Sequence, residues 1–162
     1  MPTYASSKLP PLRSWEEFED IVSDIAKLRW RDPNCSRYGR NGQRQNGVDI
    51  IGKPSYLDGL SGIQCKNSDE VNIKIINEEI TEADNFKPLL NEYIIACTAS
   101  RDVKLHSAVM QLSQERQRRG KFPVQMWFWE DIALDIARDQ ELMKKHYPQF
   151  TNSSVASEKI EK

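Results

Sequence analysis

The chain has 162 residues and a formal net charge of −1; 38% of its residues are hydrophobic and 29% are charged. These values predict one soluble domain with its own core and exclude a strongly basic protein. No run of about 18 apolar residues is present for a membrane span, and Met1–Leu12 lacks the apolar segment of a signal peptide. We therefore expect a cytoplasmic location and no membrane partner. The three cysteines form no CxxC pair, which argues against disulfides and a zinc knuckle.

The amino-terminal part predicts an extended arm followed by a helix. Residues 1–13 contain three prolines and no periodicity, and the ordered domain is expected over 14–148. Ser14 and Glu17 fit a capping box, and apolar residues then recur at helical spacing until Asp32-Pro33. Glu19 lies at the edge of this apolar stripe. Its carboxylate is expected either to reach solvent or to point at the end of the sheet.

Residues 34–46 are polar and predict at most a weak strand around Ser36 to Tyr38. Two short apolar runs follow, and each contains polar residues that a core strand would not need. Residues 47–52 and 62–67 predict two strands joined as a hairpin. The first run carries Asp49, and the second carries Gln64 and Lys66. Side chains alternate along a strand, so Gln64 and Lys66 should share a face and converge with Asp49 at one end of the sheet.

The remaining elements alternate between helix and strand. We expect a helix at 73–85, a buried strand at 93–98, a helix at 102–119 with Val103 facing inward, a strand at 124–128, and helical segments from 129 to about 147. Residues 149–162 predict a disordered tail. The fold class is therefore α/β, a three-layer sandwich with a central mixed β-sheet flanked by helices.

Two groups of residues could contact nucleic acid despite the net negative charge. The first is the loop with Arg37, Tyr38, Arg40 and Arg44; the second is Arg116, Arg118, Arg119 and Lys121. A local basic face can bind phosphates when the net charge cannot. Each group is equally well explained as a solvated surface.

The polar residues of the two runs suit cleavage of a phosphodiester bond. Mg²⁺ takes oxygen ligands, which Asp49, Glu19 and the backbone carbonyl of Cys65 would supply. Lys66 would supply a fixed positive charge for water and phosphate. Taken singly, Asp49 is better explained as a residue that caps a turn, and Lys66 as one that extends to solvent from a strand end; taken together, their compatible positions in two neighbouring apolar runs favour a site.

Three motifs together resemble the PD-(D/E)xK nuclease superfamily, and in particular its Mrr-like restriction endonuclease branch, whose motif has Asp and then Gln-x-Lys. They are Phe18-Glu19, Gly47-Val48-Asp49-Ile50 and Ile63-Gln64-Cys65-Lys66. The order of the later elements also fits, and the similarity covers roughly residues 14–137.

The resemblance implies a restriction-endonuclease-like fold and Mg²⁺-dependent DNA cleavage, with Mn²⁺ as a substitute. Asp49 would bind the metal, Lys66 would be the catalytic lysine, and Glu19 would bind or support the metal. Gln64 stands where most of the superfamily has an acid, so its role as a ligand is the weakest of the four. Such domains often serve bacterial restriction or anti-phage defence, joined to a sensor or ATPase.

Other functions on the same fold stay open at this point. A non-catalytic nucleic-acid-binding or assembly module would use the basic groups without cleavage, although it would have no need for both Asp49 and Lys66. A junction resolvase or an RNA-directed nuclease would use the same site. Cutting both strands of double-stranded DNA needs two sites, which favours a homodimer or a higher oligomer.

Overall fold

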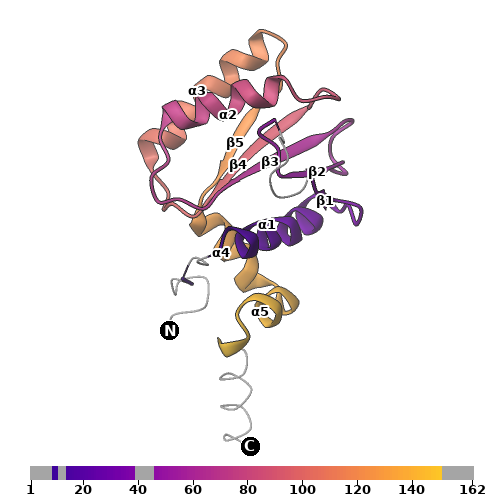
Figure 1. The fold of residues 1–162 in the computed structure, drawn as a ribbon, viewed down its shortest axis with the longest axis vertical. Helices are drawn as coiled ribbons and strands as arrows, with labels where there is room; N and C mark the ends of the chain where they lie inside the picture. Colours follow the sequence, from indigo (N-terminus) through magenta and orange to yellow (C-terminus); the bar gives the residue numbers. More distant parts are fainter. Residues whose placement is uncertain (1–8, 11–13, 39–45, 151–162) are drawn as a thin grey trace, which may run out of the picture.

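The computed structural model describes residues 9–10, 14–38 and 46–150. Arg40, Arg44, most of the predicted arm and residues 151–162 lie outside this range. The chain forms an α/β fold around one open, mixed sheet of five strands (Figure 1). None of the described helices is long and apolar enough to cross a bilayer.

The strands lie in the sheet in sequence order, from β1 to β5. Their bounds are β1 Ser36–Arg37, β2 Ile50–Gly52, β3 Ser61–Lys66, β4 Glu92–Cys97 and β5 Val124–Trp127. The first three strands pair antiparallel, and β3, β4 and β5 pair parallel. The prediction of a mixed sheet that begins with a hairpin is therefore confirmed.

Five helices cover the two faces of the sheet. They are α1 Trp15–Trp30, α2 Ile73–Asp84, α3 Val103–Arg118, α4 Trp129–Arg138 and α5 Gln140–His146. Helices α2 and α3 cover one face, and α1 and α4 cover the other, with α5 beside them (Figure 1). The result is a three-layer arrangement.

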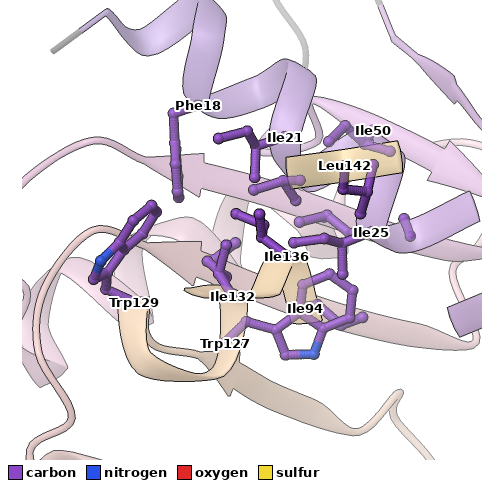
Figure 2. Packing of buried hydrophobic residues seen from close by; sticks show 14 of the residues in the cluster. Phe18, Ile21, Ile25, Ile50, Ile94, Trp127, Trp129, Ile132, Ile136 and Leu142 are labelled. Atoms are coloured by element: carbon purple, nitrogen blue, oxygen red, sulfur yellow. The ribbon is translucent and has the colours of Figure 1, made fainter. Parts of the chain in front are cut away.

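The core between the sheet and α1 contains residues from distant parts of the chain. Phe18, Ile21 and Ile25 of α1 pack against strand residues and against α4 and α5 (Figure 2). Trp129 Nε1 donates to the Leu9 carbonyl at 2.7 Å, and Leu9 is buried in this core. At the other end Phe150 also packs against the core, so the predicted tail starts too early at residue 149.

Local signals explain most helix bounds. The Ser14 hydroxyl accepts from the Glu17 amide at 3.2 Å, which caps α1 as predicted. The prediction for Val103 is wrong, because its side chain is 76% exposed. At about 100° per residue, Val103 lies roughly 200° around α3 from the buried Leu105, on the side that faces away from the sheet.

Candidate metal and phosphate site

Asp49 lies beside the carboxyl end of β3, immediately before β2. Its amide donates to the Ile63 carbonyl at 2.8 Å, and one of its carboxylate oxygens accepts from the Cys65 amide at 2.8 Å. The predicted strand at 47–52 is therefore too long at its start. Asp49 is nevertheless fixed to β3 through both its backbone and its side chain.

The usual alternation of strand side chains breaks at Asp49. Val48 belongs to the core on the α2 side of the sheet, whereas Ile50, two residues later, belongs to the core on the α1 side. In a regular strand these two side chains would share a face. The irregular backbone frees the Asp49 carboxylate from both cores and brings it to the Cys65 amide.

The turn that leads to Asp49 is fixed by contacts with α2 and β4. Gly47 has φ of +72°, and a Cβ atom there would lie 3.0 Å from the Glu79 carbonyl. The Tyr93 hydroxyl donates to the Gly47 carbonyl at 2.6 Å. Glycine is therefore required both by the left-handed conformation and by the close approach of the helix.

Glu19 is a buried acid close to Asp49, so it does not extend to solvent. Burial, followed by the negative charge of Asp49, raises the pKa of Glu19 to about 7. Burial also raises the pKa of Asp49, and the hydrogen bond from Cys65 opposes that rise. Arg37 Nη2 lies 3.4 Å from Glu19 Oε1. The site thus holds two buried acids of like charge with a guanidinium beside them.

Lys66 points to the other side of the sheet, where its ammonium pairs with the Glu79 carboxylate of α2. Ile63 and Cys65, on the opposite face of β3, pack against the α1 core. Glu19 and Lys66 therefore approach Asp49 from opposite faces. Both Lys66 and Glu79 still act electrostatically on Asp49.

Glu79 is not among the predicted site residues, although the sequence carries a signal for it. At about 100° per residue, Glu79 lies roughly 40° from Ala83, at the edge of the apolar face of α2. Glu19 has the same relation to the apolar face of α1. The edge position that marks Glu19 as a candidate therefore marks Glu79 as well.

Gln64 presents an oxygen that lacks a partner. Its Oε1 atom is buried, and within the described part of the chain it has no hydrogen-bond partner. A buried polar atom without a partner is costly, and in native structures it often marks a place where a ligand, ion or water binds. For Cys65, the contact to Asp49 is made by the amide, and the predicted role of its carbonyl stays a prediction.

Of the predicted nucleic-acid contacts, Arg37 and Tyr38 lie at the site. The Tyr38 amide donates to the Asp49 carbonyl at 2.7 Å, and the Tyr38 ring packs edge-on against Phe86 with 5.1 Å between centroids. Arg40 and Arg44 belong to the part of the loop that is not described.

Arg116 does not belong to an exposed basic surface, and this prediction is wrong. Its side chain is buried, and its guanidinium binds the Asp84 carboxylate at 2.7 and 3.2 Å and the Phe122 carbonyl at 3.1 Å. It also stacks on the Phe122 ring at 4.2 Å. Arg118 and Arg119 pair with Glu115 at the surface, and Lys121 is exposed.

A second group of potential ligands lies between α1 and α5. Asp20, Asp24 and His146 bring ligand atoms within 4.8 Å of one another. The Lys145 ammonium already lies 2.9 Å from Asp24, and His146 Nε2 lies 2.8 Å from the same carboxylate oxygen. These contacts compensate the charge of Asp24, so the group is explained as an attachment of α5 to α1.

Comparison of the chain with protein-family models, with curated proteins and with solved structures finds no match. The residues around Asp49 and their geometry are therefore the basis for a proposed function.

Proposed function

We propose that this protein is a Mg²⁺-dependent DNA endonuclease with a restriction-endonuclease-like fold, and that it serves as an effector nuclease in bacterial restriction or anti-phage defence. The observation that carries the proposal is the buried pair of Glu19 and Asp49 beside the Cys65 amide, next to a strand that presents Lys66. The motif resemblance supports the same activity.

The residues fit a divalent cation. Burial disfavours the ionised form of both acids and raises the pKa of Glu19 and of Asp49, and the charge of Asp49 raises that of Glu19 further. A bound cation would reverse that preference. The unpartnered Gln64 oxygen, on the face of β3 that also carries Lys66, offers a further neutral oxygen ligand, and an all-oxygen set suits Mg²⁺ or Mn²⁺.

When bound, Mg²⁺ would neutralise phosphate charge and make a water nucleophilic. Asp49 and Glu19 would hold it, and the Cys65 amide would keep the Asp49 carboxylate aimed. Lys66 would contribute a fixed positive charge to the attacking water or to the phosphate. Glu79, which contacts Lys66 directly, would hold its ammonium in place.

DNA cleavage by purified protein tests the proposal. Plasmid and linear DNA are incubated with Mg²⁺ or Mn²⁺, with and without EDTA, alongside Asp49→Ala and Lys66→Ala. We expect cleavage by the wild type only with metal, and at least about a 100-fold loss in each variant. Lys74→Ala, an exposed lysine of α2, is the matched control and should cleave at the wild-type rate.

Two results would contradict the proposal. One is wild-type protein that binds DNA but leaves it intact with either metal, which would favour the non-catalytic binding module. The other is cleavage that persists in both site variants, which would move the site elsewhere. Parallel assays on RNA and on four-way junctions separate the resolvase and RNA-directed alternatives.

A further inference from the structure

Arg37 provides a positive charge beside the acids of the site. Its Nη2 atom lies 3.4 Å from Glu19 Oε1, and its charge opposes the rise that burial causes in the pKa of Glu19 and of Asp49. The two partners differ in exposure: the Arg37 side chain is 42% exposed and that of Glu19 only 10%. The guanidinium therefore reaches in from solvent to acids that are fixed inside.

The contact is loose on the arginine side. Charge-assisted hydrogen bonds usually span about 2.7–2.9 Å, so 3.4 Å is a long one. The backbone of Arg37 is nevertheless well placed, because it pairs with Ile50 in the sheet and the next amide, of Tyr38, bonds to the Asp49 carbonyl. The side chain can thus move while its origin stays beside Asp49.

We propose that Arg37 is a cation-controlled phosphate-binding residue: it pairs with Glu19 when the acids hold no divalent cation, and it turns to the nucleic-acid backbone when they do. A cation and a guanidinium compete for the same carboxylate oxygens, and a double positive charge at the acids repels the arginine. Once released, its planar guanidinium matches a phosphate in geometry and charge. This inference rests on the proposed function, because it requires a cation and a nucleic acid at the same site.

If Arg37 acts in this way, cation binding and DNA binding strengthen each other. If the cation strengthens DNA binding by releasing Arg37, DNA must strengthen cation binding by the same factor. Removal of Arg37 should therefore have opposite effects on the two ligands. Cation binding in the absence of DNA should become tighter, because a competing positive charge is gone, whereas cation-dependent DNA binding should become weaker.

The test compares Arg37→Ala with Arg118→Ala, which removes the same charge from an exposed position at the end of α3. Ca²⁺ is the probe cation, titrated by calorimetry, and fluorescence anisotropy with a short labelled duplex measures DNA affinity in Ca²⁺ and in EDTA. Gels confirm that the duplex stays intact.

For Arg37→Ala we expect Ca²⁺ affinity to rise about 3-fold or more and DNA affinity in Ca²⁺ to fall about 5-fold or more. In EDTA its DNA affinity should change less than about 2-fold. Arg118→Ala should leave both the Ca²⁺ affinity and the effect of Ca²⁺ on DNA binding unchanged. Glu19→Gln should strengthen DNA binding in EDTA, because it releases Arg37 without a cation.

Equal losses of DNA affinity in Ca²⁺ and EDTA for Arg37→Ala would overturn the inference, and so would a fall in Ca²⁺ affinity. Failure of the proposed function gives a different pattern. Wild-type protein that couples Ca²⁺ and DNA binding through Arg37, but cleaves no DNA with Mg²⁺ or Mn²⁺, would contradict only the nuclease activity. Protein that binds neither ligand would overturn both proposals.

Discussion

Glu19 is the residue whose environment departs furthest from what its helix alone predicts. An acid at the edge of an amphipathic stripe usually reaches water, but Glu19 is buried, and the charge of Asp49 acts on it. Placing two like charges inside the protein makes the ionised form of the pair unfavourable. Such an arrangement opposes stability at neutral pH, and it is explained if a cation uses the pair.

The first prediction concerns stability against pH. The pKa of Glu19 rises from 4.5 to about 7 on folding, so the folded state keeps its proton where the unfolded state has lost it. This contribution is complete below about pH 4.5 and is lost as the pH rises through about 7. Chemical denaturation without metal should show the free energy of unfolding falling by about 1–3 kcal/mol between pH 5 and pH 8.

Glu19→Gln should flatten that dependence, because glutamine does not titrate, whereas Glu78→Gln, an exposed acid of α2, should retain it. The raised pKa of Asp49 acts in the same direction as that of Glu19. The lowered pKa of Asp24 acts oppositely and weakens the protein on acidification. A wild-type stability that increases steadily from pH 5 to pH 8 would contradict the prediction.

The second prediction concerns Asp49→Asn. Asparagine keeps an oxygen for the Cys65 amide but removes the charge that raises the pKa of Glu19. We expect the variant to fold with unchanged or higher stability near pH 8, to show a lower Glu19 pKa, and to lose cleavage. Thermal denaturation and an NMR titration of the Glu19 carboxyl measure the first two effects. A Glu19 pKa that does not fall would show that the two acids are not coupled.

At the scale of elements, the site depends on α2 and β4 as much as on the strands that carry its motifs. The Tyr93 hydroxyl, on β4, fixes the Gly47 turn two residues before Asp49, and the Glu79 carbonyl of α2 lies against the same glycine. The Glu79 side chain meanwhile pairs with Lys66. One turn of α2 thus contacts both Lys66 and the turn that leads to Asp49.

The third prediction tests that support through Tyr93→Phe. The change removes the hydrogen bond to the Gly47 carbonyl and leaves a partly buried acceptor unpaired, which costs about 1–3 kcal/mol. Because Asp49 follows two residues later, cleavage should also fall, by about 10-fold at a temperature where the variant is folded. Tyr56→Phe is the control, since Tyr56 is exposed. Full activity in folded Tyr93→Phe protein would show that the turn needs no such anchor.

The sequence predicts the elements well, because their signals are local. Periodicity, the Ser14 cap and the apolar strand runs all depend on neighbours along the chain. The miss at Gly47–Asp49 has a different origin: an apolar run resembles a strand even where its side chains divide between two cores. The face of the sheet on which Lys66 lies depends on helix packing, and so does its pairing with Glu79.

The roles of the basic residues also depend on contacts that are distant in the sequence. A cluster of arginines in the sequence resembles a binding surface until long-range partners are known. The Arg116 guanidinium binds the carboxylate of Asp84, which lies 32 residues away in the sequence, and the carbonyl of Phe122. No local pattern separates it from its exposed neighbours Arg118 and Arg119.

At the scale of the whole molecule, Lys66 of the proposed site and residues 116–121 lie at opposite ends of the sheet. Lys66 is the last residue of β3, whereas residues 116–121 precede β5, which is parallel to β3 through β4. The six residues of β3 span about 20 Å. If the proposed function holds, DNA would meet the end of the sheet at which Lys66 lies, whereas Arg116 at the other end has a structural role.

The last prediction separates structure from binding at that far end. Arg116 joins α3 to α2 through Asp84 and to the segment before β5 through the Phe122 carbonyl, so Arg116→Ala removes three hydrogen bonds and a stacked contact at once. We expect the free energy of unfolding to fall by about 2–4 kcal/mol, with Arg116→Lys only partly restoring it, because an ammonium cannot reproduce the planar fork. Arg118→Ala should change stability by less than about 0.5 kcal/mol, since its pair with Glu115 is exposed.

DNA affinity of folded Arg116→Ala, measured by anisotropy well below its melting temperature, should match that of the wild type. A stable variant with weakened DNA binding would instead assign this end of the sheet to the nucleic-acid interface.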